Sequence, residues 1–219
     1  TSFRTIINEA VADGILTFNP FWGYEPERPQ REQKYLTADE LELIMTTPLH
    51  NARLYIVRDL FLFSCYTGIS YGDMCLLTKE DLVTDENGTL WIRTSRKKTK
   101  VEYEVPLLEV PLHILNKYRD VEPNGKLLPM YCNSDVNKYL KTIAAKCGIN
   151  RRIVFHSARH TYATEITLSH GVPLETVSKM LGHTRVDTTQ IYAKVTDDKI
   201  NADTKRLDYK ISERFTIAI

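Results

Sequence analysis

The sequence predicts a mainly α-helical protein with one small antiparallel three-stranded β-sheet. Apolar residues recur at helical spacing along most of the chain, most clearly in NARLYIVRDLFLFSCYTG, a run that Gly68 should end. Alternation of apolar and polar residues is confined to LVTDENGTLWIRTS and VEYEVPL, between residues 82 and 107. Asn87-Gly88 marks a turn in the first of these segments, and the basic loop RKKTK joins the last two strands.

The predicted helices and breaks divide the chain into three parts. Apolar side chains at helical spacing predict a helix from residue 1 to about 17. The next segment, FNPFWGYEPERPQREQK, contains three prolines that interrupt regular secondary structure. We expect residues 1–18 to be the end of another domain, 19–35 a linker, and 36–219 the main domain with a C-terminal tail. Its first helix should start at a capping box of Thr37 and Glu40 and run to about Thr46.

Composition excludes several classes of protein. No run approaches the roughly 20 apolar residues that a membrane helix needs, and TSFRTIINEA has no signal-peptide pattern. The four cysteines form no CxxC pair, which favours reduced thiols in a cytosolic protein. His156, His160 and His183 lie within a 28-residue span, but no HExxH motif, cysteine or carboxylate completes a zinc ligand set with them. We therefore expect no metal and no membrane partner.

Basic residues are concentrated although the net charge is only +1. RTSRKKTK, residues 93–100, holds five basic residues and no acid. Residues 136–160 hold six more, again without an acid. Such segregation is typical of a face that binds a polyanion, and it is also found on ordinary solvated helices. The charge pattern alone favours neither interpretation.

The most informative stretch is FHSARHTYATEITLSHG. If a helix begins near His156, then His156 and Arg159 lie on one face, with His160 at its edge. A second helix, PLETVSKMLGH, should end at Gly182 with His183 in the turn. A third, VDTTQIYAKV, should start at a capping pattern of Asp187 and Gln190 and contain Tyr192. Taken singly, these histidines and this tyrosine are most simply explained as packing or helix-end residues.

Together the motifs resemble those of the tyrosine recombinases, also called phage integrases. The family has HxxRHT, then LGH, then a nucleophilic tyrosine, and here these match His156–Thr161, Leu181–His183 and Tyr192. NEAVADGILTFNP is similar to the end of the family's core-binding domain, and YLTADEL to the start of its catalytic domain. RKKTKVEYEVPL is similar to the hairpin that carries an active-site lysine, here Lys98. The resemblance implies the tyrosine recombinase catalytic-domain fold.

The resemblance also implies roles for these residues. Tyr192 would attack a DNA phosphodiester, giving a 3′-phosphotyrosyl link and a free 5′-hydroxyl. Arg159 and His183 would bind the phosphate oxygens, and His156 would bind phosphate or assist proton transfer. Lys98 would protonate the leaving oxygen. This chemistry requires no metal ion and no nucleotide, so no cofactor is expected. His160 would brace the site without taking part in the reaction.

One catalytic position departs from the family pattern. The usual TGLR turn reads TGIS here, so Ser70 occupies the place of the first catalytic arginine. The chain therefore resembles integrases of conjugative and integrative mobile elements that lack this arginine. Either it only binds DNA, or another arginine replaces the charge; Arg96 is the first candidate and Arg93 the second. Asp73 would hold the active-site histidines and arginines in place without contacting the substrate, or its charge would simply stabilise a helix N-terminus.

The expected partner is double-stranded DNA containing attachment sites, bound in the bacterial cytoplasm. The resemblance implies four protomers on two duplexes, a monomer when free, and accessory DNA-bending proteins. The alternating apolar tail residues Phe215, Ile217 and Ile219 would dock on a neighbouring protomer. Two alternatives remain within DNA biology, a catalytically decayed DNA-binding relative and a type IB topoisomerase-like transferase; a purely structural helical domain is the third. Candidate DNA contacts are Arg93, Lys97, Lys100, Arg151 and Arg152.

Overall fold

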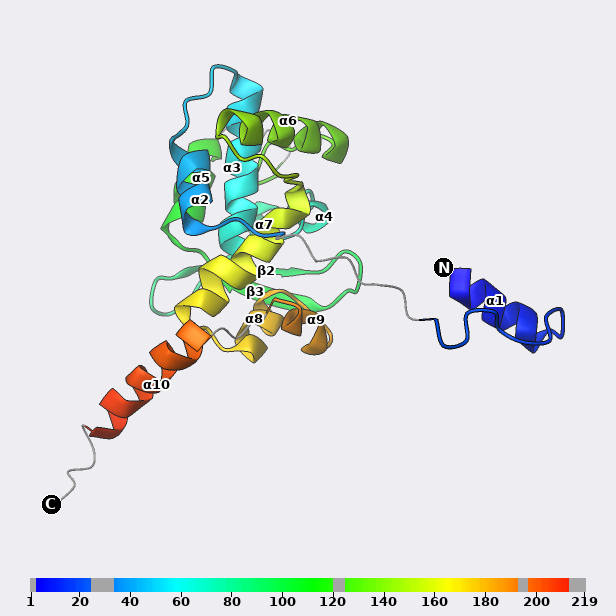
Figure 1. Ribbon diagram of the computed structural model, residues 1–219. Helices are drawn as coiled ribbons and strands as arrows, with labels where there is room; N and C mark the ends of the chain where they lie inside the picture. The colour runs from blue at the N-terminus through cyan, green and yellow to red at the C-terminus, as the bar shows by residue number, and fades with distance from the viewer. Residues whose placement is uncertain (1–2, 25–33, 120–124, 193–196, 213–219) are drawn as a thin grey trace, which may run out of the picture. The chain divides into compact units, whose positions relative to one another are not determined.

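The computed structural model describes residues 3–24, 34–119, 125–192 and 197–212 (Figure 1). Its contacts divide the chain into two compact units, residues 1–33 and 34–219. None of the described helices is long and apolar enough to cross a membrane.

In the described part of the first unit, residues 3–24, there is one helix, α1 (Phe3–Ala12), which buries none of its side chains. The helix predicted to continue to about residue 17 ends earlier. Gly14 adopts the left-handed conformation (φ 72°), and the amides of Ile15 and Leu16 both bond back to the Ala10 carbonyl. This left-handed glycine closes the helix as C-terminal glycines commonly do.

The second unit is mainly helical and contains one small sheet, as predicted. Its α-helices are α2 (Ala38–Thr46), α3 (Ala52–Thr67), α4 (Tyr71–Met74), α5 (Glu109–Tyr118), α6 (Asn133–Lys146), α7 (Phe155–Thr161), α8 (Leu174–Met180), α9 (Asp187–Gln190) and α10 (Asp197–Ser212). A π-helical segment, Tyr162–Thr167, continues α7, and short 3₁₀ turns lie at Lys79–Asp81 and Leu168–His170.

Helix α3 forms the centre of this unit, with α5, α6 and α7 packed around it (Figure 1). Apolar residues occur all around it rather than on one stripe, which is typical of a buried helix. The Asn51 side chain accepts from the Arg53 amide at its start, and Gly68 ends it in the left-handed conformation (φ 71°). The capping box of Thr37 and Glu40 on α2 is also present, as predicted.

The sheet lies beside α8 and has the order β1 (Leu82–Thr84), β2 (Leu90–Ser95), β3 (Glu102–Pro106), all antiparallel. Ile92, Tyr103 and Val105 are its buried side chains. The turn between β2 and β3 is closed by the Arg96 amide bonded to the Val101 carbonyl, and Lys100 in it has a positive φ of 58°. This turn fixes Arg96 at the inner end of the hairpin.

The region around Tyr192 differs from the prediction. Helix α9 ends at Gln190, so Tyr192 lies in the turn that follows it and not within the helix. The residue that precedes α9 is Val186 with helical backbone angles, so Asp187 and Gln190 form no capping pair. The Asp187 carboxylate accepts instead from Arg185, at 2.7 Å. The apolar tail residues Phe215, Ile217 and Ile219 lie outside the described residues.

Substituting Gly68 tests how tightly the end of α3 is packed. A Cβ at Gly68 would lie 2.4 Å from Tyr162 Cδ1 and 2.8 Å from Leu181 Cδ2. Gly148 has a similar φ of 72°, but a Cβ there would meet nothing within 4 Å. Gly148→Ala should cost only the left-handed strain of ~1–2 kcal/mol. Gly68→Ala should cost a further ~1–3 kcal/mol of overpacking, measured by urea unfolding. Equal losses of unfolding free energy in Gly68→Ala and Gly148→Ala would contradict the close packing of Gly68 against Tyr162 and Leu181.

Candidate active site

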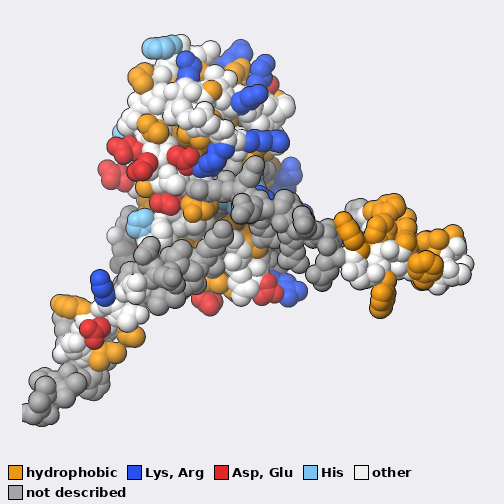
Figure 2. Space-filling view, viewed as in Figure 1, with side chains coloured by type: hydrophobic (Ala, Val, Ile, Leu, Met, Phe, Trp, Pro, Cys, Tyr) orange, Lys and Arg blue, Asp and Glu red, His pale blue; other side chains and the backbone are white. Residues whose placement is uncertain are grey.

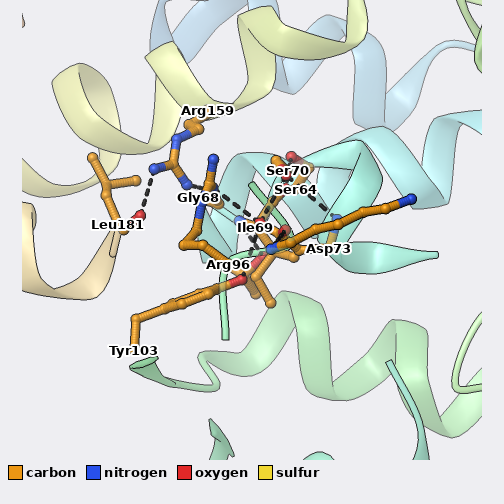
Figure 3. Close-up of polar contacts among 11 residues, drawn as sticks. Ser64, Gly68, Ile69, Ser70, Asp73, Arg96, Tyr103, Arg159 and Leu181 are labelled. Atoms are coloured by element: carbon orange, nitrogen blue, oxygen red, sulfur yellow. Dashed lines mark hydrogen bonds and ion pairs between the residues drawn. The ribbon is translucent and has the colours of Figure 1, made fainter. Parts of the chain in front are cut away.

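Arg159 is the most deeply buried basic residue of the predicted site, only 2% exposed. Its Nη1 donates to the Gly68 carbonyl at 2.7 Å and its Nη2 to the Leu181 carbonyl (Figure 3). Burial and the positive charge of Arg96 lower the Arg159 pKa to about 10, so the guanidinium stays charged at neutral pH. Arg159 therefore joins the end of α3 to the end of α8 while carrying its charge into the site.

Asp73 on α4 connects the Ser70 turn to the hairpin. Its Oδ1 accepts from the Lys97 amide at 2.9 Å, and its Oδ2 accepts from the Ser70 hydroxyl at 2.8 Å. Oδ2 also lies 3.0 Å from Arg96 Nη1 in an ion pair, and the carboxylate is 3% exposed. Asp73 also lies in the first turn of α4, so its place is compatible with both predicted functions and does not separate them.

Arg96 reaches from the hairpin toward Arg159 (Figure 3). Its aliphatic stem packs against the LGH turn so closely that a Cβ at Gly182 would lie 2.8 Å from Arg96 Cγ. Apart from the ion pair with Asp73, Nη1 is buried without a hydrogen-bond acceptor among the described residues. Burial, then the charges of Arg159 and Arg96, lower the pKa of His156 and His183. Burial raises the pKa of Tyr192, and the same two charges oppose that rise.

The histidines and the tyrosine form a row of rings. His156 and His160 have centroids 4.8 Å apart at 82°, and His160 and Tyr192 5.0 Å apart at 75°. On its other side Tyr192 stacks on His183, with centroids 6.5 Å apart and an interplanar angle of 14°. Tyr192 is 7% exposed. Three separate segments, α7, the LGH turn and the turn after α9, thus converge on one phenol.

The protonation states follow from burial and charge. Burial raises the pKa of the Tyr192 phenol, and the nearby charges of Arg159 and Arg96 oppose that rise. Burial, followed by neighbouring positive charge, lowers the pKa of His160 and of His183 to about 4. At neutral pH the site therefore presents a phenol and neutral imidazoles beside two cationic guanidinium groups.

A pocket of about 420 Å³ opens beside these groups. Ser70, His156 and Arg159 line it together with Tyr71 and Asn137. Ser70 therefore faces open space together with two of the predicted catalytic side chains. Among the described residues, no three His, Cys, Asp or Glu side chains gather as a metal site would require.

The structure brings together most of the predicted site residues but leaves others apart. Lys98 is exposed on the hairpin turn, as are Lys97 and Lys100. Arg93 pairs with Glu104 at 3.0 Å on the strand surface. Arg152 is exposed, whereas Arg151 binds the Tyr35 carbonyl and the Glu40 carboxylate and so also holds the start of α2.

Three residues of this region were missed by the sequence analysis. Thr189 bonds His183, Tyr103 lies beside Asp73, and Gly182 makes room for Arg96. The glycine of the LGH motif was the one available signal, since its position between two predicted helices favours a turn.

Comparison with known proteins decides the family. Residues 34–199 match the phage integrase family. The chain belongs to this family. It is 28% identical over 217 residues to a tyrosine recombinase of Pseudothermotoga lettingae, covering 94% of this chain and 73% of the relative. It is 30% identical over 212 residues to the tyrosine recombinase XerD of Listeria monocytogenes, covering 89% and 69% respectively.

Solved structures show the same fold. XerA recombinase superposes with a TM-score of 0.62 at 23% identity, covering 91% of this chain and 70% of XerA. The Tn1549 transposon integrase superposes with a TM-score of 0.70 at 17% identity, covering 93% and 76%. The predicted catalytic-domain fold is confirmed. The family and its curated relatives confirm the predicted function, that of a site-specific recombinase, and the predicted enzyme class, a tyrosine-type DNA strand transferase.

The low histidine pKa values predict how this integrase responds to acid. His160 and His183 titrate at about 4, below the ordinary 6.5 that they regain on unfolding. The unfolded chain binds more protons in this interval, so stability present above about pH 6.5 should be lost as the pH falls toward about 4. Urea midpoints across this range should fall less steeply for His160→Gln and His183→Gln than for the wild type. Identical slopes would exclude these histidines as the cause.

Proposed function

We propose that Tyr192 is the nucleophile of this recombinase. Its oxygen attacks a DNA phosphorus, the bond to the 5′-oxygen breaks, and a 3′-phosphotyrosyl link conserves the bond energy for rejoining. The observation that carries this proposal is the placement of the Tyr192 ring between His160 and His183, within the field of Arg159 and Arg96. Those two charges favour the phenolate that attack requires, against the effect of burial.

The surrounding residues have complementary roles in this proposal. Two of the five guanidinium N–H groups of Arg159 hold the backbone, and the others would bind phosphate oxygens. His183 donates to the same phosphate, and His156 binds it or assists transfer of the phenol proton. Lys98 protonates the leaving 5′-oxygen; its exposed place on the hairpin turn suits contact with bound DNA. His160 supports the Tyr192 ring.

We further propose that this integrase lacks the family's first catalytic arginine at position 70 and that Arg96 supplies its charge. Ser70 can donate one hydrogen bond, and Asp73 already accepts it. Arg96 is held by the same Asp73 carboxylate, so the charge reaches the site from the hairpin instead of from the turn after α3. Its influence on the pKa of Arg159, His183 and Tyr192 supports this assignment.

The proposed substrate is a pair of double-stranded DNA attachment sites. A lambda integrase dimer bound to a COC′ core site and XerH bound to its difH substrate share the fold of this chain. Lys and Arg side chains gather over the end of the second unit that carries α6 (Figure 2). We propose DNA contacts from this surface and from Arg93, Lys97, Lys100, Arg151 and Arg152, of which Arg151 also pairs with Glu40.

The proposed assembly is a homotetramer on DNA formed from free monomers in the bacterial cytoplasm, aided by accessory DNA-bending proteins. Residues 1–18 would belong to a core-binding domain, 19–35 to a linker, and 36–219 to the catalytic domain with its tail. The first unit supports this division because it exposes large apolar side chains that a larger domain would cover. Those within residues 1–18 are Phe3, Ile6, Ile15 and Phe18.

A second function, DNA binding without cleavage, is favoured only by Ser70. A type IB topoisomerase-like reaction would use the same nucleophile but would not join partner sites. Covalent trapping separates these possibilities. The protein should form a gel-stable adduct with nicked attachment-site DNA in the presence of a chelator, and Tyr192→Phe should form none while still binding. Binding without any adduct from the wild type would favour the non-cleaving relative.

Replacing Arg96 tests the proposed substitution of charge. At saturating DNA, Arg96→Ala should lower the rate of adduct formation by ~10²–10³, the usual loss for one electrostatic donor. Arg93→Ala is the matched variant, because Arg93 is on the same hairpin but pairs with Glu104 on its surface. Arg93→Ala should weaken DNA binding but leave the rate of adduct formation normal at saturating DNA. A large rate loss for Arg93→Ala, with none for Arg96→Ala, would assign the charge to Arg93. The melting temperature of each variant shows whether it is folded under the assay conditions.

A further inference from the structure

Thr189 lies directly behind His183. It belongs to α9, is completely buried (0% exposed), and its Oγ1 lies 2.7 Å from His183 Nδ1. The bond joins two segments, the LGH turn and the short helix that precedes Tyr192. Neither the motifs nor the proposed reaction accounts for a buried hydroxyl at this place.

Burial decides which group donates in this contact. If His183 Nδ1–H donated, the Thr189 hydroxyl proton would need another acceptor, and none lies within bonding distance among the described residues. An unmade hydrogen bond on a buried hydroxyl costs ~1–3 kcal/mol, so the favoured arrangement has Thr189 donating to Nδ1. A neutral imidazole that accepts at Nδ1 carries its hydrogen on Nε2.

Burial, reinforced by the positive charges around it, keeps the His183 imidazole neutral. Arg159 and His156 on α7 and Arg96 on the hairpin act on it, and no acid has a resolved effect on its pKa. The Tyr192 ring stacks against it. A neutral ring can donate to a phosphate only through a nitrogen that carries hydrogen, so the tautomer determines whether His183 binds the phosphate at all.

Thr189 also contacts the nucleophile's backbone. Its carbonyl accepts from the Tyr192 amide at 3.0 Å. The side chain of one residue therefore sets the orientation of His183, and its main chain sets the start of the turn that carries Tyr192.

We propose that Thr189 is a positioning residue that fixes His183 as the Nε2–H tautomer and holds it in register with Tyr192. Resting on the function proposed above, this assignment makes His183 a neutral donor to the attacked phosphate. Thr189 itself touches neither the phosphate nor the reacting oxygen.

Nitrogen NMR of the ¹⁵N-histidine-labelled chain tests the tautomer without any DNA. The His183 signals, identified by their loss in His183→Gln, should show hydrogen on Nε2 and none on Nδ1 at neutral pH. Thr189→Val keeps the shape but removes the hydroxyl, so it should mix the tautomers and raise the pKa of His183. Thr189→Ser should restore the wild-type pattern. Hydrogen on Nδ1 in the wild type, or no change in Thr189→Val, would overturn the proposal.

Covalent trapping supplies the functional readout. Thr189→Val should form adduct at least about tenfold more slowly, with the ~10²–10³ expected for losing a donor outright as the upper bound. Thr189→Ser should stay near the wild-type rate. A normal rate for Thr189→Val would overturn the positioning role. If the wild type forms no adduct, the proposed function fails, whereas the NMR result still decides the tautomer.

Discussion

The ion pair between Asp73 and Arg96 is the interaction on which the site depends. Asp73 is almost fully buried, and a buried carboxylate is stable only when it is paired and hydrogen-bonded. Its three strongest contacts come from Arg96, the Lys97 amide and the Ser70 hydroxyl, so one carboxylate joins the hairpin to the turn after α3. Removing one partner of such a pair typically lowers the free energy of unfolding by ~3–5 kcal/mol. The ion pair therefore holds the hairpin against the turn after α3.

The remaining geometry follows from where Arg96 is held. Its stem fills the space that the absent side chain of Gly182 leaves, and its charge lies close enough to act on Arg159 and on Tyr192. Arg159 in turn ties the Gly68 and Leu181 carbonyls together. Two like charges are thereby brought to one place, an arrangement that lowers the pKa of Arg159 and is suited to binding an anion.

Sequence reasoning succeeded where the deciding interactions are local. The cap at Thr37, the end of α3 at Gly68 and the hairpin turn each depend on neighbours within a few residues. It failed at Tyr192, where helical periodicity continued past the true end of α9. The contacts of Arg96 with Gly182 and of Thr189 with His183 depend on tertiary geometry that no spacing reveals. That Arg96 supplies the charge expected at position 70 stays a prediction.

The most direct measurement is the rate of covalent adduct formation when the positive charge of Arg96 is removed and an arginine is placed at position 70. Ser70 lines the pocket shared by His156 and Arg159, and its hydroxyl lies 2.8 Å from Asp73, so an arginine there has both space and a partner. If Arg96 supplies this charge, Ser70→Arg should restore most of the activity lost in Arg96→Ala. A folded, DNA-binding double variant that remains as slow as Arg96→Ala would contradict the claim that Arg96 replaces the missing arginine.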